Sequence, residues 1–274
     1  MRIGLTAILL VFVGLQLGKT QDTLFIYKKS GGVDFYLVSE LDSMDFTRGH
    51  VALDTSTVIN LPFDSIGTVA DIDGNSYPTI KIGGQYWMAA DLKVTRFSNG
   101  DPIPTTCPPT LDITQENNPI YQWAWQGIEC NAKDYGRMYT WFVAGDARNV
   151  CPTGWHVPSD AEWSTLVSFV GGATVVGATA GGVALKDTVG WNNSAGNLNS
   201  VGFNARGGGY RDEPGLFDLR NEATHYWTST WDPTLNTNGN GYPGVYRSFL
   251  EGDSKVYRYA HLPNHGFHIR CLKN

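Results

Sequence analysis

The residues best suited to chemistry lie in one stretch near the C-terminus, between Tyr226 and Asp253. Aromatic side chains are mixed there with amides and carboxylates. The candidate ligand-binding residues are Trp231, Asp232, Asn236, Asn238, Tyr242, Tyr246, Glu251 and Asp253. Aromatic rings can cover the apolar face of a sugar ring, while Asn and Asp side chains can bind its hydroxyl groups. The pattern therefore favours glycan binding.

The same oxygen-bearing side chains are ligands that calcium takes in proteins, so calcium is the one cofactor that this region suggests. A second calcium-like run is Asp71 to Asn75, but position 12 of a calcium loop requires Glu, and here it is Ile82. Asp73-Gly74 between two alternating segments instead predicts a hairpin. No metal ligand set is assigned.

No set of catalytic residues emerges from the sequence. The late histidines lack the spacing of a helical zinc pair, and no serine lies in a Gly-x-Ser-x-Gly motif. Paired carboxylates for glycoside hydrolysis would have to come from Asp212, Glu213, Glu251 and Asp253. We therefore expect a protein that is not an enzyme, with hydrolysis as a third hypothesis.

The first 20 residues have the organisation of a secretory signal peptide. A basic start precedes an apolar run over 5–17 and small residues from Gly18 to Thr20. The run is too short for a membrane span, so we expect cleavage after Thr20 and export. No later segment of the sequence is apolar enough to cross a bilayer. We expect an extracellular or outer-surface location, with the periplasm as the alternative.

Charge and cysteine content narrow the class of protein further. The formal net charge is -6, and nucleic-acid binding requires a basic face, so nucleic acid is excluded as a partner. The chain has four cysteines, and an exported chain with an even number is expected to form disulfides. Four cysteines allow three pairings.

The pattern of apolar residues predicts the elements that position these side chains. Ser159 and Glu162 form a capping box, and the apolar residues from Trp163 to Val170 then recur at helical spacing. A second short amphipathic helix is expected over 135–142. Alternation predicts strands at 68–73, 77–82, 85–88, 202–205, 226–230, 245–250, 256–259 and 266–272.

A separate module precedes this domain. Two β-rich runs, 23–27 and 33–38, flank Gly31-Gly32 and predict a hairpin. Such a module is too small to bury a core of its own. We expect three parts: a signal peptide over 1–20, a hairpin module and linker over 21–62, and the main domain over 63–274.

Several segments together carry a family resemblance. They are Val69–Leu92, Asp134–Trp163, Gly207–Arg211, Tyr226–Thr230 and Gly266–Cys271. In this order they resemble the Fibrobacter succinogenes major paralogous domain. The resemblance implies an exported bacterial surface domain with a C-type-lectin-like fold: α+β, with two helices, a small twisted antiparallel sheet and long loops.

The resemblance also bears on the cysteines and the ligand. A Cys151–Cys271 bond resembles the linkage that ties the last strand of lectin-like domains to the helical region, and it leaves Cys107–Cys130 to close a local loop. The Glu-Pro-Asn and Trp-Asn-Asp motifs of calcium-dependent sugar binding are absent from the sequence. Gly154–Trp163 is also similar to a stretch of formylglycine-generating enzymes, which implies a shared fold.

We therefore expect an exported, non-catalytic binding or adhesion protein of the bacterial surface, with a glycan or a surface protein as its partner. The alternative is a structural or assembly component that uses the lectin-like domain as a display scaffold. Exposure of Trp227, Trp231 and Tyr242 on one surface would favour glycan binding, and burial of all three would favour the scaffold.

Overall fold

The computed structural model describes residues 23–27, 33–37, 67–171, 177–234 and 243–274. The chain divides into two compact units, 1–59 and 60–274. The expected signal peptide and most of the expected linker lie outside the described residues. Across the residues that are described, no helix is both long enough and apolar enough to cross a membrane.

The first unit contains the expected hairpin. Strands β1 (Thr23–Tyr27) and β2 (Val33–Leu37) pair antiparallel. Thr23 lies opposite Leu37, and Tyr27 lies opposite Val33. The β-branched and aromatic residues of both runs suit a pleated strand, which is why alternation predicted them correctly.

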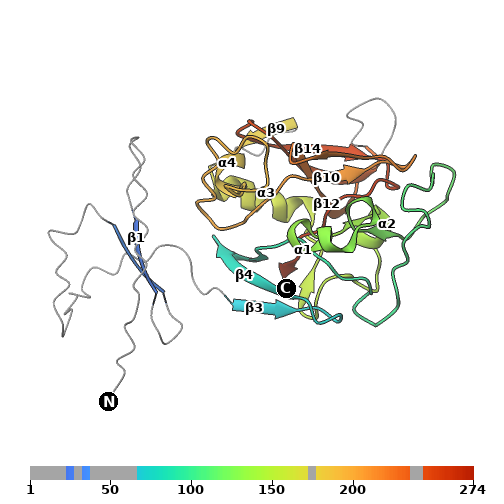
Figure 1. Cartoon of the computed structure of the whole chain (residues 1–274), viewed down its shortest axis with the longest axis horizontal. Helices are drawn as coiled ribbons and strands as arrows, with labels where there is room; N and C mark the ends of the chain where they lie inside the picture. Colours follow the sequence, from blue (N-terminus) through green and yellow to red (C-terminus); the bar gives the residue numbers. More distant parts are fainter. Residues whose placement is uncertain (1–22, 28–32, 38–66, 172–176, 235–242) are drawn as a thin grey trace, which may run out of the picture. The chain divides into compact units, whose positions relative to one another are not determined.

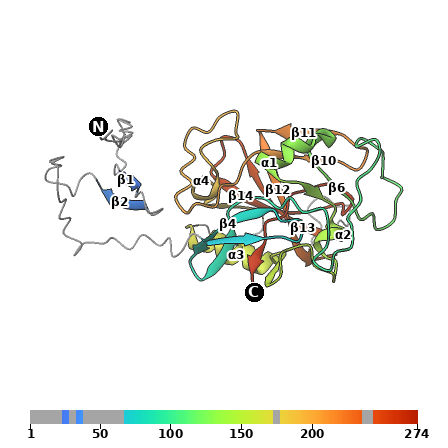
Figure 2. The same ribbon diagram turned by 60° about the horizontal axis from the view of Figure 1, so that its bottom comes forward.

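The second unit is mixed α+β, and its smaller sheet has the order β3-β4-β5-β15-β8. Its strands are β3 (Gly67–Ala70), β4 (Ser76–Ile82), β5 (Gln85–Met88), β8 (Trp155–His156) and β15 (Leu272–Lys273). The hairpin predicted at Asp73-Gly74 is confirmed, because β3 and β4 pair antiparallel. The Asp71 Oδ1 atom accepts the N–H groups of Asp73 and Asn75 at 3.0 and 2.9 Å, so this carboxylate closes the first turn. Figure 2 shows β15, in dark red, beside the cyan strands.

The larger sheet has the order β11-β10-β12-β13-β14-β9. Its strands are β9 (Gly177–Ala180), β10 (Gly208–Arg211), β11 (Phe217–Arg220), β12 (Ala223–Trp231), β13 (Gly244–Leu250) and β14 (Lys255–His261). The expected antiparallel pairing holds except between β10 and β12, which pair parallel through Gly209 and Thr224. The expected strand at 202–205 is a loop instead, because its backbone turns at Asn204, where φ is +57°. The last predicted strand is reduced to β15.

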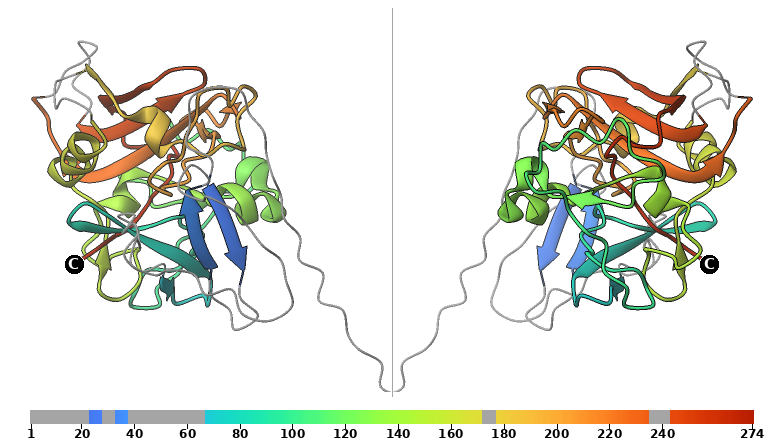
Figure 3. Two further views of the ribbon diagram at one scale, coloured as in Figure 1. Left: turned by 90° about the vertical axis from the view of Figure 1, so that its left-hand side faces the viewer. Right: turned by 90° about the vertical axis from the view of Figure 1, so that its right-hand side faces the viewer.

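One predicted helix is confirmed. Helix α3 (Asp160–Phe169) begins at the expected capping box, in which Glu162 accepts the Ser159 backbone N–H at 2.7 Å and donates its own N–H to the Ser159 hydroxyl at 3.3 Å. Trp163 on its apolar face is fully buried. Figures 1 and 3 show α3 beside the orange and red strands of the larger sheet.

The expected helix over 135–142 is wrong. The segment is divided into α1 (Ala132–Tyr135), β7 (Met138–Tyr139) and α2 (Trp141–Ala144), and β7 pairs with β6 (Gln122–Trp123). Gly136 breaks it: φ is +70°, and a Cβ there would lie 2.6 Å from the Asp91 Cβ. The chain has to turn at this close approach. The remaining short helices are η3 (Trp125–Gly127), η4 (Glu129–Asn131) and α4 (Gly182–Leu185).

An aromatic cluster fills the space between α3 and the two sheets. We call it the Trp163 cluster, and its rings are Trp87, Trp163, Phe203, Tyr226 and Phe249. The Trp163 ring centroid lies 4.9 Å from that of Trp87 and 5.5 Å from that of Tyr226. All five rings are fully buried. They join α3 to β5 of one sheet and to β12 and β13 of the other.

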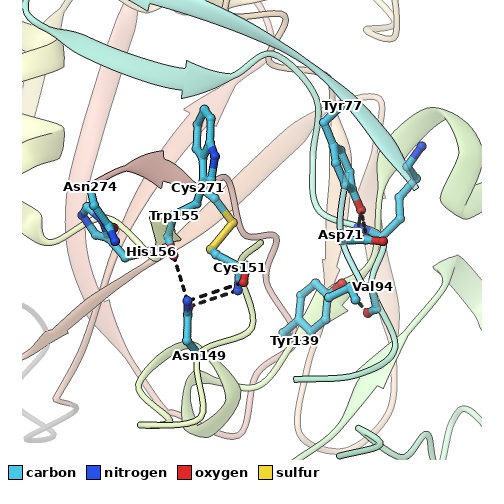
Figure 4. The surroundings of a disulfide bond; sticks show 11 residues. Asp71, Tyr77, Val94, Tyr139, Asn149, Cys151, Trp155, His156, Cys271 and Asn274 are labelled. Carbon is cyan, nitrogen blue, oxygen red and sulfur yellow. Dashed lines mark hydrogen bonds between the residues drawn. A yellow bond between two sulfur atoms is a disulfide. The ribbon is translucent and has the colours of Figure 1, made fainter. Parts of the chain in front are cut away.

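A disulfide joins Cys151 to Cys271, as the family resemblance implied (Figure 4). The Asn149 side chain supports it, because its oxygen accepts the Cys151 N–H at 3.1 Å and its nitrogen donates to the Trp155 carbonyl at 2.8 Å. The bond ties the segment before α3 to the residue that precedes β15. A disulfide of this kind is consistent with an exported protein.

The expected Cys107–Cys130 bond is wrong. Both cysteines are free and exposed. The segments that carry them approach each other elsewhere, at Gly127 and Pro109, where a Cβ on Gly127 would lie 2.3 Å from the proline Cγ. This packing contact brings the two loops together without a covalent link.

Candidate functional site

Trp231 is unusual among the tryptophans of this chain. Its side chain is 45% exposed at the end of β12. Seven of the nine tryptophans are at most 8% exposed: Trp87, Trp123, Trp125, Trp155, Trp163, Trp191 and Trp227. Because burial of a large ring is strongly favourable, an exposed tryptophan in such a domain marks a surface available to a ligand.

Trp231 belongs to a group of three aromatic side chains, which we call the aromatic patch: Trp141, Phe142 and Trp231. The Trp231 ring centroid lies 4.5 Å from that of Trp141, at an interplanar angle of 53°, and 6.4 Å from that of Phe142. The Trp141 side chain is held in place by a hydrogen bond, because its Nε1 donates to the Thr228 carbonyl at 3.0 Å. Trp141 and Phe142 are partly exposed.

Two glycines make room for the patch. A Cβ on Gly145 would lie 2.6 Å from the Trp141 ring, and one on Gly244 would lie 3.2 Å from it. Gly244 is also the residue opposite Trp231 across β12 and β13, beyond a register shift that begins after Trp227. The irregular end of β12 and these two small residues therefore place the Trp231 ring against Trp141.

Asp232 adds a carboxylate next to the patch. Its backbone N–H donates to the Pro243 carbonyl at 2.8 Å. Its Oδ1 accepts the Thr234 N–H at 2.9 Å and the Thr234 hydroxyl at 2.6 Å. These bonds fix the carboxylate beside Trp231, where an oxygen acceptor could receive a ligand hydroxyl.

Of the other predicted ligand-binding residues, those that the structure describes do not join this surface. Asn236, Asn238 and Tyr242 lie outside the described residues. Tyr246 is buried, with its ring centroid 6.0 Å from that of Trp227 and 4.8 Å from that of Phe267. Its side chain faces the core because strand alternation puts it on the same face as these rings.

Glu251 and Asp253 lie in the turn between β13 and β14, at the end of β13 opposite to Gly244. At roughly 3.3 Å per residue the strand separates the two ends by about 20 Å. Asp253 accepts a bond from the Tyr257 hydroxyl, and its carbonyl accepts one from the Lys186 ammonium. Trp231 with Asp232 and Glu251 with Asp253 therefore lie at opposite ends of β13, and the structure does not bring them together.

The described carboxylates do not converge on a cation. Within residues 67–171, 177–234 and 243–274, no three His, Cys, Asp or Glu side chains are grouped so that they could hold a metal ion. Two of the carboxylates considered for hydrolysis already have partners within the protein. Asp212 Oδ1 accepts the N–H groups of Gly215 and Leu216, and Glu213 lies 2.9 Å from His265 Nδ1.

Two histidines of the larger sheet, the buried His225 and the half-buried His261, have lowered pKa values. The His225 ring packs against Tyr210 and Phe267, with centroids 5.4 and 4.9 Å away. Burial, with a contribution from His268, lowers the pKa of His225 to about 3. Burial, with a contribution from His265, lowers the pKa of His261 to about 4. Both rings are therefore neutral at neutral pH.

Sequence reasoning missed two members of the aromatic patch. The helix expected over 135–142 would place Phe142 on its apolar face, and the sequence suggested no role for Trp141. The one local signal is the glycine at position 145, four residues after Trp141 and therefore one helical turn along. The second glycine, at position 244, meets Trp141 only through tertiary structure, so the sequence does not reveal it.

Comparison with known proteins places the chain in a family. The model of the Fibrobacter succinogenes major domain matches residues 80–273, which include α3, the Cys151–Cys271 disulfide and most strands of both sheets. No curated protein and no solved structure was found to match. The matched region covers most of the chain, and the chain therefore belongs to the Fibrobacter succinogenes major domain family.

Proposed function

We propose that this protein is an exported, non-catalytic binding protein of the bacterial surface and that its aromatic patch binds a glycan. The observation that carries this proposal is the exposed Trp231 ring, held against Trp141 at 4.5 Å and flanked by Asp232. The C–H groups on one face of a pyranose pack well on the electron-rich face of an aromatic ring. The Asp232 carboxylate supplies a hydrogen-bond acceptor for the hydroxyl groups at the edge of that sugar.

The fixed geometry of the patch supports binding. Trp141 is anchored by its bond to Thr228 and by the close approach of Gly145, so little side-chain freedom is lost when a ligand docks. The ligand would be a neutral glycan, because the rings of the patch are uncharged and one acceptor accompanies them. The proposal does not call for calcium, since Asp232 lies at one end of β13 and Glu251 and Asp253 lie at the other.

The proposed location and fold rest on separate observations. The Cys151–Cys271 disulfide suits an oxidising compartment, and the first residues have the pattern of a signal peptide. A lectin-like arrangement is supported by the linkage of the last strand to the segment that precedes α3. In this proposal the second unit is the binding domain, and the hairpin of the first unit attaches it to the surface.

The second candidate is a structural or assembly component. Burial of Trp227 favours it, because exposure of this ring was one condition for glycan binding, and the candidate ligand-binding residue Tyr246 also belongs to the core. In that case the aromatic patch would contact a protein of the surface layer. A glycan array separates the two candidates.

The test is binding of residues 21–274 to a broad array of neutral and acidic glycans, once with calcium and once with a chelator. We expect saturable binding in both conditions. Binding that the chelator abolishes would contradict the calcium-independent arrangement. The absence of binding in both conditions would contradict the glycan proposal and favour the assembly component.

A further inference from the structure

A second candidate site shares no residue with the aromatic patch. A cavity of about 370 Å³ opens beside α1, next to the segment that follows β5 and the loops that follow α4. Its volume falls in the lower part of the range of roughly 300–1,000 Å³ that is typical of small-molecule sites. Its lining includes seven charged side chains, so it is a polar site, whereas the patch is apolar.

A buried ion pair forms its floor. The Arg270 Nε donates to Asp91 Oδ1 at 2.8 Å, and Arg270 Nη2 contacts the same oxygen. The two side chains are 1% and 4% exposed. The Arg270 guanidinium also lies over the Phe203 ring, 4.3 Å from its centroid, and its Nη1 donates to the Phe203 carbonyl. The floor is thus rigid, and its charges cancel.

The walls are fixed by backbone contacts. The Asn204 side chain donates to the Ala89 carbonyl at 3.1 Å, and the Asn204 backbone carbonyl accepts a bond from Arg270 Nη2 at 3.3 Å. Gly136 lines the opposite wall, where a Cβ would lie 2.6 Å from the Asp91 Cβ. A cavity with such walls is preformed, so a ligand would not have to order it.

Arg206 offers unused donors. Its Nε donates to Asp187 Oδ2 at 2.7 Å, which neutralises a carboxylate that is 9% exposed. Across the described ranges, its two terminal nitrogens have no hydrogen-bond partner, and the side chain is 35% exposed. Two parallel N–H donors on one guanidinium match the two oxygens of a carboxylate.

Two lysines at the rim add positive charge. The Lys93 ammonium lies 5.2 Å from the centroid of the Tyr77 ring, and Lys133 is exposed on α1. Neither ammonium has a carboxylate within ion-pair distance among the residues that the structure describes. Four cationic and three anionic side chains line the cavity, so its formal charge is +1, whereas that of the whole chain is -6.

We propose that this cavity binds a small hydroxylated carboxylate of monosaccharide size, such as a uronic acid. The ligand carboxylate would accept bonds from Arg206 and the rim lysines. Its hydroxyl groups would meet the remaining acceptor positions of Asp91 and Asp187, which a simple anion could not use. This site is independent of glycan binding at Trp231, because it shares no residue with the aromatic patch.

The test is isothermal titration of residues 21–274 with glucuronate, and in parallel with glucose, acetate and inorganic phosphate. We expect saturable binding of glucuronate, with affinity at least ~10-fold above that for each of the other three compounds, because each lacks either the carboxylate or the hydroxyl groups. Equal affinity for glucose would overturn the carboxylate assignment. Equal affinity for acetate or phosphate would overturn the assignment of a hydroxylated ligand.

Variants locate the site without disturbing the fold. The double variant Lys93→Gln with Lys133→Gln removes two rim charges that lack acidic partners, and it should weaken glucuronate binding by ~10-fold or more. Lys255→Gln, on the exposed start of β14, is the matched control and should bind like the parent. Unchanged binding in the double variant, or no glucuronate binding by the parent, would overturn the proposal.

Trp231→Ala separates this site from the proposed glycan site. It should retain glucuronate binding at the parent affinity, since the two sites share no residue. If Trp231→Ala loses glucuronate binding, the acid binds at the aromatic patch and the cavity proposal is wrong.

Discussion

The Trp163 cluster and the aromatic patch use the same residue types at similar spacing and have opposite exposure. Trp163 lies 4.9 Å from Trp87 and is fully buried, whereas Trp231 lies 4.5 Å from Trp141 and is 45% exposed. The cluster is enclosed by α3 and two sheets. The patch is built from side chains of α2 and β12, and all three of its rings remain partly exposed.

The difference in exposure separates rings that stabilise the domain from rings that we propose bind a ligand. Rings covered on all sides contribute most of the free energy that burial supplies. Rings covered on one side contribute less to folding, but they keep a surface on which a ligand can gain burial. We therefore expect substitutions in the cluster to change the free energy of unfolding and substitutions in the patch to change ligand binding.

The largest loss of stability should come from removing the Cys151–Cys271 disulfide. The Cys151–Cys271 bond spans 120 residues, so replacing both cysteines by Ala should lower the free energy of unfolding by about 5 kcal/mol in the chain-entropy model. The measurement is urea unfolding. Cys107→Ala with Cys130→Ala is the control, since both are free, and it should stay within about 0.5 kcal/mol of the parent. An equal loss in the control would contradict the assignment of the bond.

Trp163→Ala should follow in size. It leaves a cavity between α3 and both sheets, and a substitution of this kind costs about 3–5 kcal/mol. The midpoint of urea unfolding should fall while the unfolding slope stays constant. If the free energy of unfolding falls by no more than in Trp231→Ala, the two aromatic groups do not differ in their contribution to stability.

A third test uses pH. An unfolded histidine takes up a proton below about pH 6.5, but native His225, with a pKa of about 3, does not. The unfolded state therefore gains protons first, and the stability that depends on neutral His225 is complete above about pH 6.5 and is lost as pH falls toward 3.

His225→Phe should reduce this pH dependence. The ring already packs among Tyr210, Tyr246 and Phe267, so Phe fits the site in size and character. Urea unfolding at pH 7 and pH 5 should show a smaller loss on acidification than in the parent chain. An identical loss would mean that His225 is protonated in the native state over this range.

The smallest change in stability should come from Trp231→Ala. Because almost half of the side chain is exposed, we expect the free energy of unfolding to fall by no more than about 1 kcal/mol. Phe169→Ala is the matched control, since Phe169 is 50% exposed at the end of α3. A loss of several kcal/mol for Trp231→Ala alone would make the patch part of the core.

Local signals allowed part of this fold to be predicted. The capping box at Ser159 identified α3, and the Asp73-Gly74 turn identified a hairpin, because both features depend on neighbouring residues. The helix expected over 135–142 failed at Gly136, whose turn is required by contact with Asp91, far away in the sequence. Periodicity cannot reveal such a contact.

The candidate site was predictable only in part for the same reason. Trp231 and Asp232 were chosen by their residue types and are neighbours at the end of β12, and their role in ligand binding stays a prediction. The burial of Tyr246 was not predicted, because alternation along β13 does not say which face of the strand is covered. Glu251 was grouped with Trp231 because the two are close in the sequence. The seven-residue strand β13 lies between them and keeps them apart.

The most direct test of the central claim is a titration of three proteins with the best neutral glycan from the array. They are the parent chain, Trp231→Ala and Phe169→Ala, and all three should be folded by circular dichroism. We expect equal affinity for the parent and Phe169→Ala, and a loss of ~10-fold or more for Trp231→Ala, because stacking on an aromatic ring is removed. Equal affinity for all three would contradict the central claim.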